Sequence, residues 1–196
     1  MAPTICNSAA LYIESMQDRL NALDSQSIDT LASWLFNIWR NDRLVVTLGN
    51  GGSAFTASHL VTDLVKTAAV DGRRRLRAIS LADNMGLVTA VGNDLDYEEV
   101  FAYQLESFAR RDDLAIAISA SGNSPNVIKA ARWANAHGVQ VVALTGFDGG
   151  KLATMADLSI HVPSNNYGII EDLHLAIGHM ISQSLRCRIL NDGDAS

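Results

Sequence analysis

The sequence predicts a three-layer α/β sandwich, in which a parallel sheet of about five strands lies between two layers of helices and follows an N-terminal helical hairpin. Short continuous apolar runs recur along the chain, and such runs are typical of strands that are buried on both faces. Segments of about 10–15 residues with helical spacing separate most of these runs. Alternation of this kind indicates a parallel sheet with helices on both faces.

Two helices are expected before the first strand. Residues 8–24 and 28–40 carry large apolar side chains at helical spacing, and Ser27 is positioned to cap the second helix. A helical hairpin of this kind packs on its own domain or on a second subunit, and the spacing leaves both arrangements open.

The remaining predicted elements alternate along the chain. The apolar runs that predict strands are residues 44–48, 76–80, 114–118, 139–144 and 158–162. The segments that predict helices are residues 53–66, 98–110, 125–137 and 169–190.

The composition is that of one folded domain of ordinary size covering residues 1–196. Hydrophobic residues make up 48% of the chain and charged residues 18%, which excludes a disordered protein. The net charge of −6 argues against broad binding to a nucleic acid, although one pocket can still hold a small anion. We expect no membrane span and no secretory signal. Cys6 and Cys187 lack metal-binding spacing, and a cytoplasmic location is the simplest expectation.

A glycine-rich loop follows the first predicted strand. Open parallel sheets bind ligands at the carboxyl ends of their strands, so this loop is a candidate binding segment. Gly51 and Gly52 permit a tight turn and let a ligand approach the N–H groups at the start of the next helix. Ser53 is placed to cap that helix or to contact the ligand. A plain glycine turn remains the alternative, because short glycine motifs are weakly specific.

A serine-rich loop follows the third predicted strand. Ser119, Ser121 and Ser124 crowd onto a helix start that Pro125 fixes, although a helix cap needs only one hydroxyl. Hydroxyls and free N–H groups form a neutral cradle for a phosphate monoester, so we favour phosphate binding over a simple cap. No Gly-Lys-Ser or Gly-Lys-Thr sequence follows this loop, so the motif that binds nucleoside triphosphates is absent from it.

A third glycine-rich loop, after the fourth predicted strand, carries Lys151, for which a surface turn is the simpler interpretation.

Two pairs of acidic and histidine side chains lie on predicted helices. His59 and Asp63 are four residues apart and share one helix face. Glu171 and His179 are eight residues apart, a separation of about 12 Å along a helix that keeps them from being close neighbours. All four side chains are suitable ligands for zinc or another divalent ion. Each pair taken alone is more simply a structural or surface contact.

Together these motifs resemble the phosphoheptose isomerases of the sugar isomerase (SIS) domain superfamily, and the resemblance extends over nearly the whole chain. It rests on GNGGS at residues 49–53 followed by His59, GND at 92–94 leading to Tyr97, ISASGNSPN at 118–126, LTGFDGGKL at 144–152, and His179. Members of this family interconvert sedoheptulose 7-phosphate and D-glycero-D-manno-heptose 7-phosphate.

The resemblance implies a SIS fold and a homotetramer with active sites at subunit interfaces, in which the helices of residues 1–42 are used in oligomerisation. It implies that the hydroxyls of the serine loop hold the phosphate with help from Asn50 and Ser53, and that Asp94 contacts the sugar. The substrate-binding residues expected on this basis are Asn50, Gly51, Gly52, Ser53, Asn93, Asp94, Ser119, Ala120, Ser121, Ser124 and Glu171.

The resemblance also implies an acid–base pair at Asp63 and His179 and, as in some members, a zinc ion held by positions matching His59, Asp63, Glu171 and His179. Aldose–ketose isomerisation moves a proton between C1 and C2 through an enediol, and a carboxylate and an imidazole suit this task near neutral pH. We therefore expect an enzyme, a phosphosugar isomerase with zinc or another divalent ion in each active site.

Four positions depart from the family pattern. Asp63 and Glu171 replace a glutamate and a glutamine, while Gly168 and Thr67 replace an aspartate and an arginine. We expect the basic run at residues 73–75 to be solvated rather than to replace the lost arginine.

The competing hypothesis is a SIS protein without catalytic activity, which binds a sugar phosphate or, as a tetramer, a replication-initiator protein. A binder tolerates loss of the acid–base pair. Retention of both an acid at residue 63 and a histidine at residue 179 favours the enzyme.

Overall fold

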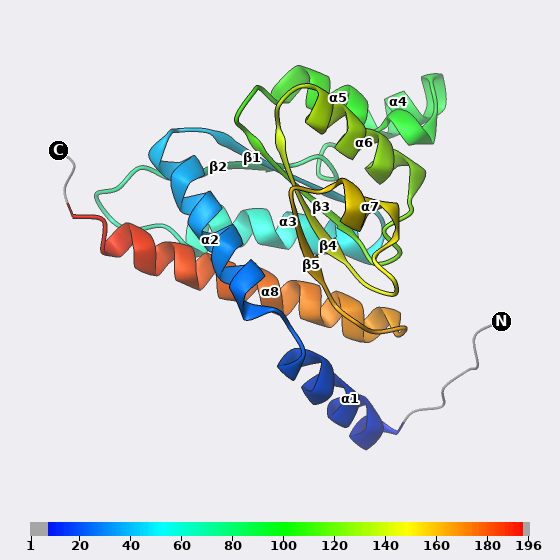
Figure 1. The fold of residues 1–196 in the computed structure, drawn as a ribbon. Helices are drawn as coiled ribbons and strands as arrows, with labels where there is room; N and C mark the ends of the chain where they lie inside the picture. The colour runs from blue at the N-terminus through cyan, green and yellow to red at the C-terminus, as the bar shows by residue number, and fades with distance from the viewer. Residues whose placement is uncertain (1–7, 194–196) are drawn as a thin grey trace.

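A five-stranded parallel sheet organises the protein in this computed structural model, which describes residues 8–193 (Figure 1). The strands are β1 (Leu44–Gly49), β2 (Arg77–Ser80), β3 (Leu114–Ser119), β4 (Gln140–Thr145) and β5 (Leu158–His161). Their order in the sheet is β2-β1-β3-β4-β5, and every neighbouring pair is parallel, as the sequence predicts. Cys6 lies outside the described residues.

Helices cover both faces of the sheet. They are α1 (Ala9–Asn21), α2 (Ser25–Arg40), α3 (Gly52–Thr62), α4 (Met85–Asp94), α5 (Ala102–Phe108), α6 (Pro125–Ala136), α7 (Gly150–Met155) and α8 (Tyr167–Leu190), with a short π-helix η1 (Asp63–Thr67) and a 3₁₀ turn η2 (Tyr97–Glu99). α2, α3 and α8 lie on one face, and α4 to α7 lie on the other (Figure 1). Among residues 8–193, no helix has the length and apolar character needed to cross a membrane.

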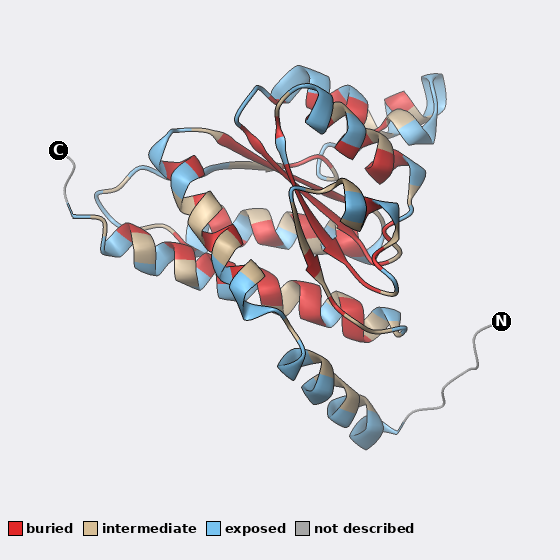
Figure 2. Cartoon of the chain, viewed as in Figure 1, coloured by how far each residue is buried: buried red, intermediate tan, exposed pale blue. Residues whose placement is uncertain are grey.

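The two faces of each central strand belong to two separate hydrophobic cores. Val45 packs in the core beneath α2, α3 and α8, while its neighbour Val46 packs in the core beneath α4, α5 and α6. All six residues of β1 and of β3 are buried, because successive side chains point to opposite faces and both faces are covered (Figure 2). This double burial accounts for the continuous apolar runs in the sequence.

The helices differ from their predicted form in three respects, each for a local reason. Asp24 rather than Ser27 caps α2: the Asp24 carboxylate accepts from the Gln26 N–H, and the Ser27 hydroxyl donates to it as well. The helix predicted over residues 98–110 is divided into η2 and α5. The prediction omits α4 and α7, because short helices that contain glycine leave a weak periodic signal.

α1 does not pack as one arm of a closed hairpin. It extends away from the N-terminal end of α2 and contacts α8, while α2 itself packs against α8 (Figure 1). None of its residues is buried, and Leu11, Ile13 and Leu20 are exposed (Figure 2). Its anchor is Tyr12, whose hydroxyl donates to Asp172 Oδ2 on α8 at 2.6 Å. Much of the apolar surface of α1 therefore remains open in a single chain.

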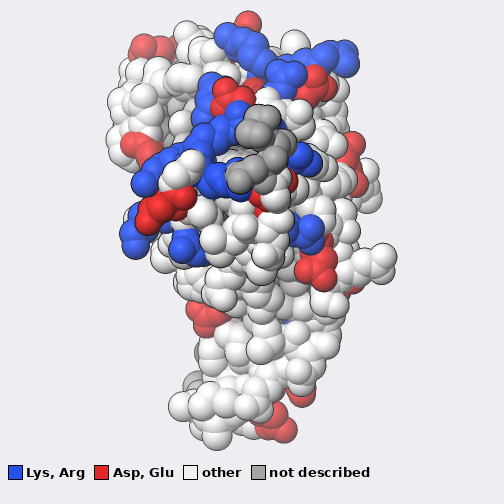
Figure 3. Space-filling view, turned by 90° about the vertical axis from the view of Figure 1, so that its left-hand side faces the viewer, with Lys and Arg blue, Asp and Glu red and all other residues white. Residues whose placement is uncertain are grey.

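Basic side chains gather near the C-terminal end of α8, interspersed with acidic ones (Figure 3). Arg74 donates to the carbonyl of Arg40 on α2, and Arg73 donates to the carbonyl of Asp192 at 2.5 Å. These two arginines tie the loop before β2 to neighbouring helices, while Arg74 and Arg75 remain exposed, in line with the expected solvated cluster. They lie just before the amino end of β2, whereas the loops predicted to bind phosphate follow the carboxyl ends of β1 and β3.

Candidate active site

The two loops predicted to bind phosphate meet where the order of the strands reverses. From β1 the chain moves outward to β2 and then returns to β3 on the other side of β1. The loops after β1 and β3 start from neighbouring points, since Gly49 is paired with Ile118 in the sheet. Open parallel sheets bind ligands in the crevice that such a reversal creates.

The loop after β1 leads into a helix without a side-chain cap. Gly51 occupies the capping position of α3 with φ +55°, a conformation that glycine adopts without strain. The N–H groups in the first turn of α3 therefore remain available to a ligand. Ser53 is buried in that turn and is not the cap, which corrects one of the two roles expected for it.

A small hydrogen-bond network fixes Asn50. Its amide exchanges two hydrogen bonds with the Asn126 amide, at 2.8 and 2.9 Å, and its Oδ1 also accepts from the Tyr97 hydroxyl at 3.0 Å. Asn126 is buried on α6, and Tyr97 belongs to η2. Neither residue is among the predicted site residues. In the sequence, only the position of Asn126 and Tyr97 in or beside the family motifs could have indicated a role for them.

The serine loop presents hydroxyls at the start of α6. Ser119 is buried at the end of β3, and its Oγ lies 3.5 Å from Oγ of Ser124, the residue at the capping position of α6. Ser124 makes no side-chain capping bond; Pro125 has no N–H and the Val127 N–H donates to Asn126 Oδ1, so the Asn126 N–H is the first-turn group of α6 left for a ligand. Ser121 is half-buried in the same loop. Two helix starts without side-chain caps thus lie at one crevice, an arrangement that favours a phosphate.

The third glycine-rich loop supports the serine loop. Gly122 has φ +61°, and a Cβ there would stand 2.0 Å from the Gly149 carbonyl oxygen. The Leu152 N–H donates to the Gly122 carbonyl at 2.9 Å, and the Lys151 N–H donates to Asn123 Oδ1 at 3.1 Å. The LTGFDGGKL segment therefore fixes the backbone of the serine loop from outside the crevice.

The remaining predicted substrate contacts lie on adjoining segments. Asn93 and Asp94 are exposed at the end of α4, where Asn93 Nδ2 donates to Asp94 Oδ1 at 2.8 Å. η2 follows, and its Tyr97 reaches the glycine-rich loop. Ala120 is buried, and its carbonyl accepts the Gly146 N–H at 2.9 Å. Ala120 therefore contributes to the shape of the serine loop through its backbone.

Three ionisable side chains converge between α3, η1 and α8. His59 Nε2 lies 3.1 Å from His179 Nε2 and 3.4 Å from Asp63 Oδ2, and His179 Nε2 lies 3.5 Å from the same oxygen. Asp63 is buried, whereas both histidine side chains are 47% exposed. Local spacing predicts the pair on α3, but the contact with His179 spans 120 residues and arises when α8 packs along α3.

The two carboxylate oxygens of Asp63 have different surroundings. Oδ1 accepts from Thr67 Oγ1 at 2.9 Å, whereas Oδ2 is buried without a hydrogen-bond partner. A buried carboxylate oxygen without a donor is unfavourable, and a cation beside it removes that cost. Ligand atoms about 2.0–2.2 Å from a tetrahedral zinc ion lie about 3.4 Å apart, which is close to the three separations in this cluster. His59, Asp63 and His179 therefore fit a divalent metal ion.

Glu171 stands apart from this cluster. Its carboxylate lies against Gly52, where a Cβ would stand 2.4 Å from Oε1. Gly52 is about 10 Å from His59 along α3, and Glu171 is about 12 Å from His179 along α8. The two helices therefore run side by side in the same direction, with Glu171 at the glycine-rich end. The structure brings three of the four predicted metal ligands together and leaves Glu171 at the start of α3.

Two further contacts of α8 are structural. His174 is fully buried, and desolvation lowers its pKa to about 4, although its Nε2–H donates to the Thr145 carbonyl at 3.2 Å. The hydrogen bond to Asp172, reinforced by burial, raises the pKa of Tyr12 to about 12. Gly168 leaves room for the Tyr12 hydroxyl, because a Cβ at residue 168 would stand 3.1 Å from it. Both contacts fix the start of α8, which carries Glu171.

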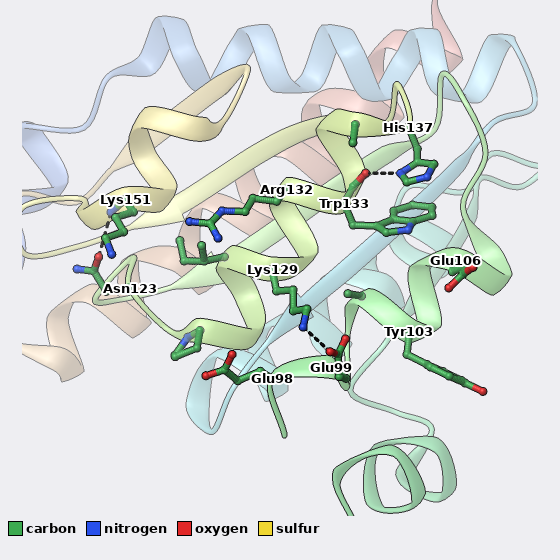
Figure 4. Close-up of a pocket in the computed structure, with 14 residues that line it drawn as sticks. Glu98, Glu99, Tyr103, Glu106, Asn123, Lys129, Arg132, Trp133, His137 and Lys151 are labelled. Atoms are coloured by element: carbon green, nitrogen blue, oxygen red, sulfur yellow. Dashed lines mark hydrogen bonds and ion pairs between the residues drawn. The ribbon is translucent and has the colours of Figure 1, made fainter. Parts of the chain in front are cut away.

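A separate hollow of about 680 Å³ lies between η2, α5 and α6, on the outer side of the serine loop (Figure 4). Charged side chains of both signs line it, and Lys129 is paired with Glu99. Trp133 stacks on His137 at another part of its wall. The hollow contains none of the residues predicted for catalysis or metal binding. The crevice between β1 and β3 and the cluster on α3 and α8 are therefore the candidate active site.

Glycine-rich and serine-rich loops at the reversal of the strand order, together with an acid–histidine cluster, are typical of α/β proteins that bind a phosphorylated small molecule. In agreement, the SIS domain family matches residues 11–146. The chain is 38% identical over 166 residues to the phosphoheptose isomerase of Sulfurimonas denitrificans, covering 85% of each chain. The solved phosphoheptose isomerase of Neisseria gonorrhoeae has a TM-score of 0.83 and 31% identity, with 90% of this chain and 95% of that chain covered.

The chain belongs to the phosphoheptose isomerase family of SIS-domain proteins. A second relative, the phosphoheptose isomerase of Aliarcobacter butzleri, is 38% identical over 174 residues, which are 89% of this chain and 87% of the relative. Membership confirms the predicted SIS fold and the prediction of an enzyme of the phosphosugar isomerase type.

Proposed function

We propose that the protein isomerises sedoheptulose 7-phosphate to D-glycero-D-manno-heptose 7-phosphate through an enediol. The observation that supports this most is the combination of two uncapped helix starts at one crevice with the His59–Asp63–His179 cluster further along α3. The relatives at 38% identity are named phosphoheptose isomerase, which supports a heptose phosphate as the substrate. We propose a cytoplasmic enzyme that binds neither nucleic acid nor membrane.

The phosphate binds at the starts of α3 and α6 in this proposal. The groups that hold it are backbone N–H groups and the polar side chains of Asn50, Ser53, Ser119, Ser121 and Ser124. Such a neutral cradle needs no cation, which suits a chain with threonine at residue 67. The start of α3 and His59 are about 10 Å apart along the helix, so a long sugar phosphate reaches both ends of the site. Binding energy from the remote phosphate then positions the reacting carbons.

The reacting end of the sugar lies at the cluster. A base removes a proton from C1 of the ketose, and the enediol takes up a proton at C2 while the carbonyl moves to C1. We assign Asp63 to the carbon-bound proton and His179 to the proton that moves between the two oxygens. Because the imidazoles of His59 and His179 cover Asp63 Oδ2, they must part to admit the sugar, and their exposure leaves room for this movement.

His59, Asp63 and His179 are the residues that would hold zinc or another divalent ion. A bound ion would polarise the carbonyl and hydroxyl oxygens of the sugar. Metal ligation and proton transfer draw on the same Nε2 and Oδ2 atoms, so chelation distinguishes the two uses of the cluster. Glu171, together with Asn93 and Asp94, is assigned to the hydroxyl groups of the sugar.

We also propose that residues 1–196 form one SIS domain that assembles as a homotetramer with active sites at subunit interfaces, and that the helices of residues 1–42 are used in assembly. The exposed apolar side chains Leu11, Ile13 and Leu20 on α1 support this proposal. Light scattering should give a mass four times the 21.1 kDa of the chain. A monomeric mass at micromolar concentration would contradict it.

The isomerase proposal is tested by incubating the protein with sedoheptulose 7-phosphate and measuring the aldose product. We expect conversion of the phosphorylated sugar and, because the phosphate positions the substrate, a much lower kcat/KM for sedoheptulose itself. Activity that a chelator removes and added zinc restores would assign the cluster to the metal, whereas activity that survives chelation would assign it to proton transfer. Binding of sugar phosphates without conversion of any of them would favour the non-catalytic SIS protein instead.

A further inference from the structure

We propose that Thr67 is a positioning residue, which holds the Asp63 carboxylate in the orientation that presents Oδ2 to His59 and His179. This inference rests on the proposed function, because it concerns the same cluster. The Thr67 hydroxyl donates to Asp63 Oδ1 at 2.9 Å, and it is the one hydrogen-bond donor to this carboxylate among the described residues.

The hydrogen bond distinguishes two oxygens that are otherwise equivalent. The terminal torsion of an aspartate is soft, so packing alone sets the direction of each oxygen weakly. With Oδ1 engaged by the hydroxyl, Oδ2 stays 3.4 and 3.5 Å from the two Nε2 atoms. The Asp63 side chain is only 9% exposed, which limits the access of water as a substitute donor.

The backbone places the threonine hydroxyl at the right point. Asp63 and Thr67 are the first and last residues of η1, where the Ala68 N–H donates to the Asp63 carbonyl at 2.8 Å and closes a π-type turn. Residues four apart on a helix lie on one face, and the branched threonine side chain has few rotamers from which to aim its hydroxyl.

Thr67 is itself tied to α8. Arg186 Nη1 donates a hydrogen bond to the Thr67 carbonyl oxygen at 3.5 Å and another to the Ala69 carbonyl oxygen. Arg186 follows His179 by seven residues, so both side chains leave the same side of α8 about 10 Å apart. One helix thus supplies His179 and also anchors the residue that orients Asp63.

The test compares Thr67→Val, which removes the hydroxyl but keeps the branched shape, with Thr67→Ser, which keeps the hydroxyl. Thr62→Val is the matched control, because the Thr62 hydroxyl donates to the Ser58 carbonyl at 3.3 Å, one turn earlier on α3. The first readout is the imidazole ¹⁵N NMR spectrum of the full-length, metal-free protein. The second readout is the dissociation constant for Co²⁺ without sugar, measured by competition with a coloured chelator.

We expect Thr67→Val to shift the His59 and His179 imidazole signals and to weaken Co²⁺ binding about tenfold, the effect typical of losing an outer partner of a ligand. Thr67→Ser and Thr62→Val should match the wild type. Unchanged imidazole signals in Thr67→Val, or an equal change in Thr67→Ser, would overturn the inference. No sugar enters this test, so a wild-type protein that fails to isomerise sedoheptulose 7-phosphate counts against the proposed function alone.

Discussion

Asp63 is the residue on which the account of the site depends most. It is buried, one of its oxygens is engaged by Thr67, and the other lacks a donor beside two histidine nitrogens. A buried carboxylate oxygen without a donor is unfavourable unless a metal ion or the substrate contacts Oδ2. Its geometry is therefore explained by function better than by stability.

Replacing the carboxylate by an amide tests this assignment. Asp63→Asn keeps the shape of the side chain but removes the proton acceptor, so kcat should fall by about 10²–10⁴-fold while the fold and the mass of the assembly stay unchanged. Steady-state kinetics measures kcat, circular dichroism checks the fold, and light scattering checks the mass of the assembly. A variant with wild-type kcat would show that Asp63 is not the base.

The same residue marks the limit of reasoning from the sequence. Spacing predicts that His59 and Asp63 share a helix face, and this is correct. The approach of His179 depends on how α8 lies along α3, which no local pattern encodes. Helix spacing does predict that Glu171 and His179 are not close neighbours. The placement of Glu171 against Gly52 and of Tyr12 beside Gly168 appears only when the helices are packed.

Strands and helices were predictable to different degrees for physical reasons. Central strands are buried on both faces, so their apolar runs stand out in the sequence. α4 and α7 lack such a signal, and η1 continues α3 without an interruption in the pattern. The glycine-rich and serine-rich loops were predictable because glycine and serine carry specific backbone and capping roles.

The packing of the third glycine-rich loop against the serine loop leads to a stability prediction. Gly122→Ala places a methyl group against the Gly149 carbonyl, whereas Gly72→Ala, also at positive φ, meets nothing within 4 Å. Gly72→Ala should cost about 1–2 kcal/mol through its φ alone. Gly122→Ala should cost at least about 2 kcal/mol more and raise KM for the sugar phosphate.

Urea unfolding of the two variants measures the difference, and substrate titration measures KM. Equal destabilisation by both substitutions would mean that the serine loop can move away from its support. In that case the third glycine-rich loop would not fix the phosphate crevice.

The packing of α8 against the sheet makes the stability of the protein depend on pH. Burial lowers the pKa of His174 to about 4 in the folded state, whereas an exposed histidine has a pKa of about 6.5. The unfolded chain therefore binds the proton first as the pH falls. The contribution of His174 is complete above pH 6.5 and is lost progressively down to about pH 4, by up to about 3 kcal/mol.

NMR titration of the imidazole signals checks this prediction together with urea unfolding at several pH values. The His174 signal should remain that of a neutral imidazole at pH 5.5, while the free energy of unfolding declines from its value at pH 7. A His174 signal that titrates near pH 6.5 would show that α8 is packed less tightly against β4 than the structure indicates.

The joint arrangement of sheet, crevice and cluster is what makes the chain an isomerase in this account. In the proposed mechanism, the crevice binds the phosphate, the parallel course of α3 and α8 sets the distance to the cluster, and the cluster acts at C1 and C2. Each part has other uses in other proteins, so the decisive observation is a proton moving between those two carbons.

The measurement that tests this most directly is the conversion of sedoheptulose 7-phosphate in deuterated water, followed by NMR with and without a chelator. An enediol exchanges its protons with solvent, so we predict aldose product with deuterium at C2, and loss of the signal on chelation if the metal is required. Absence of both product and deuterium exchange, in a protein that is folded and binds the sugar phosphate, would contradict the account.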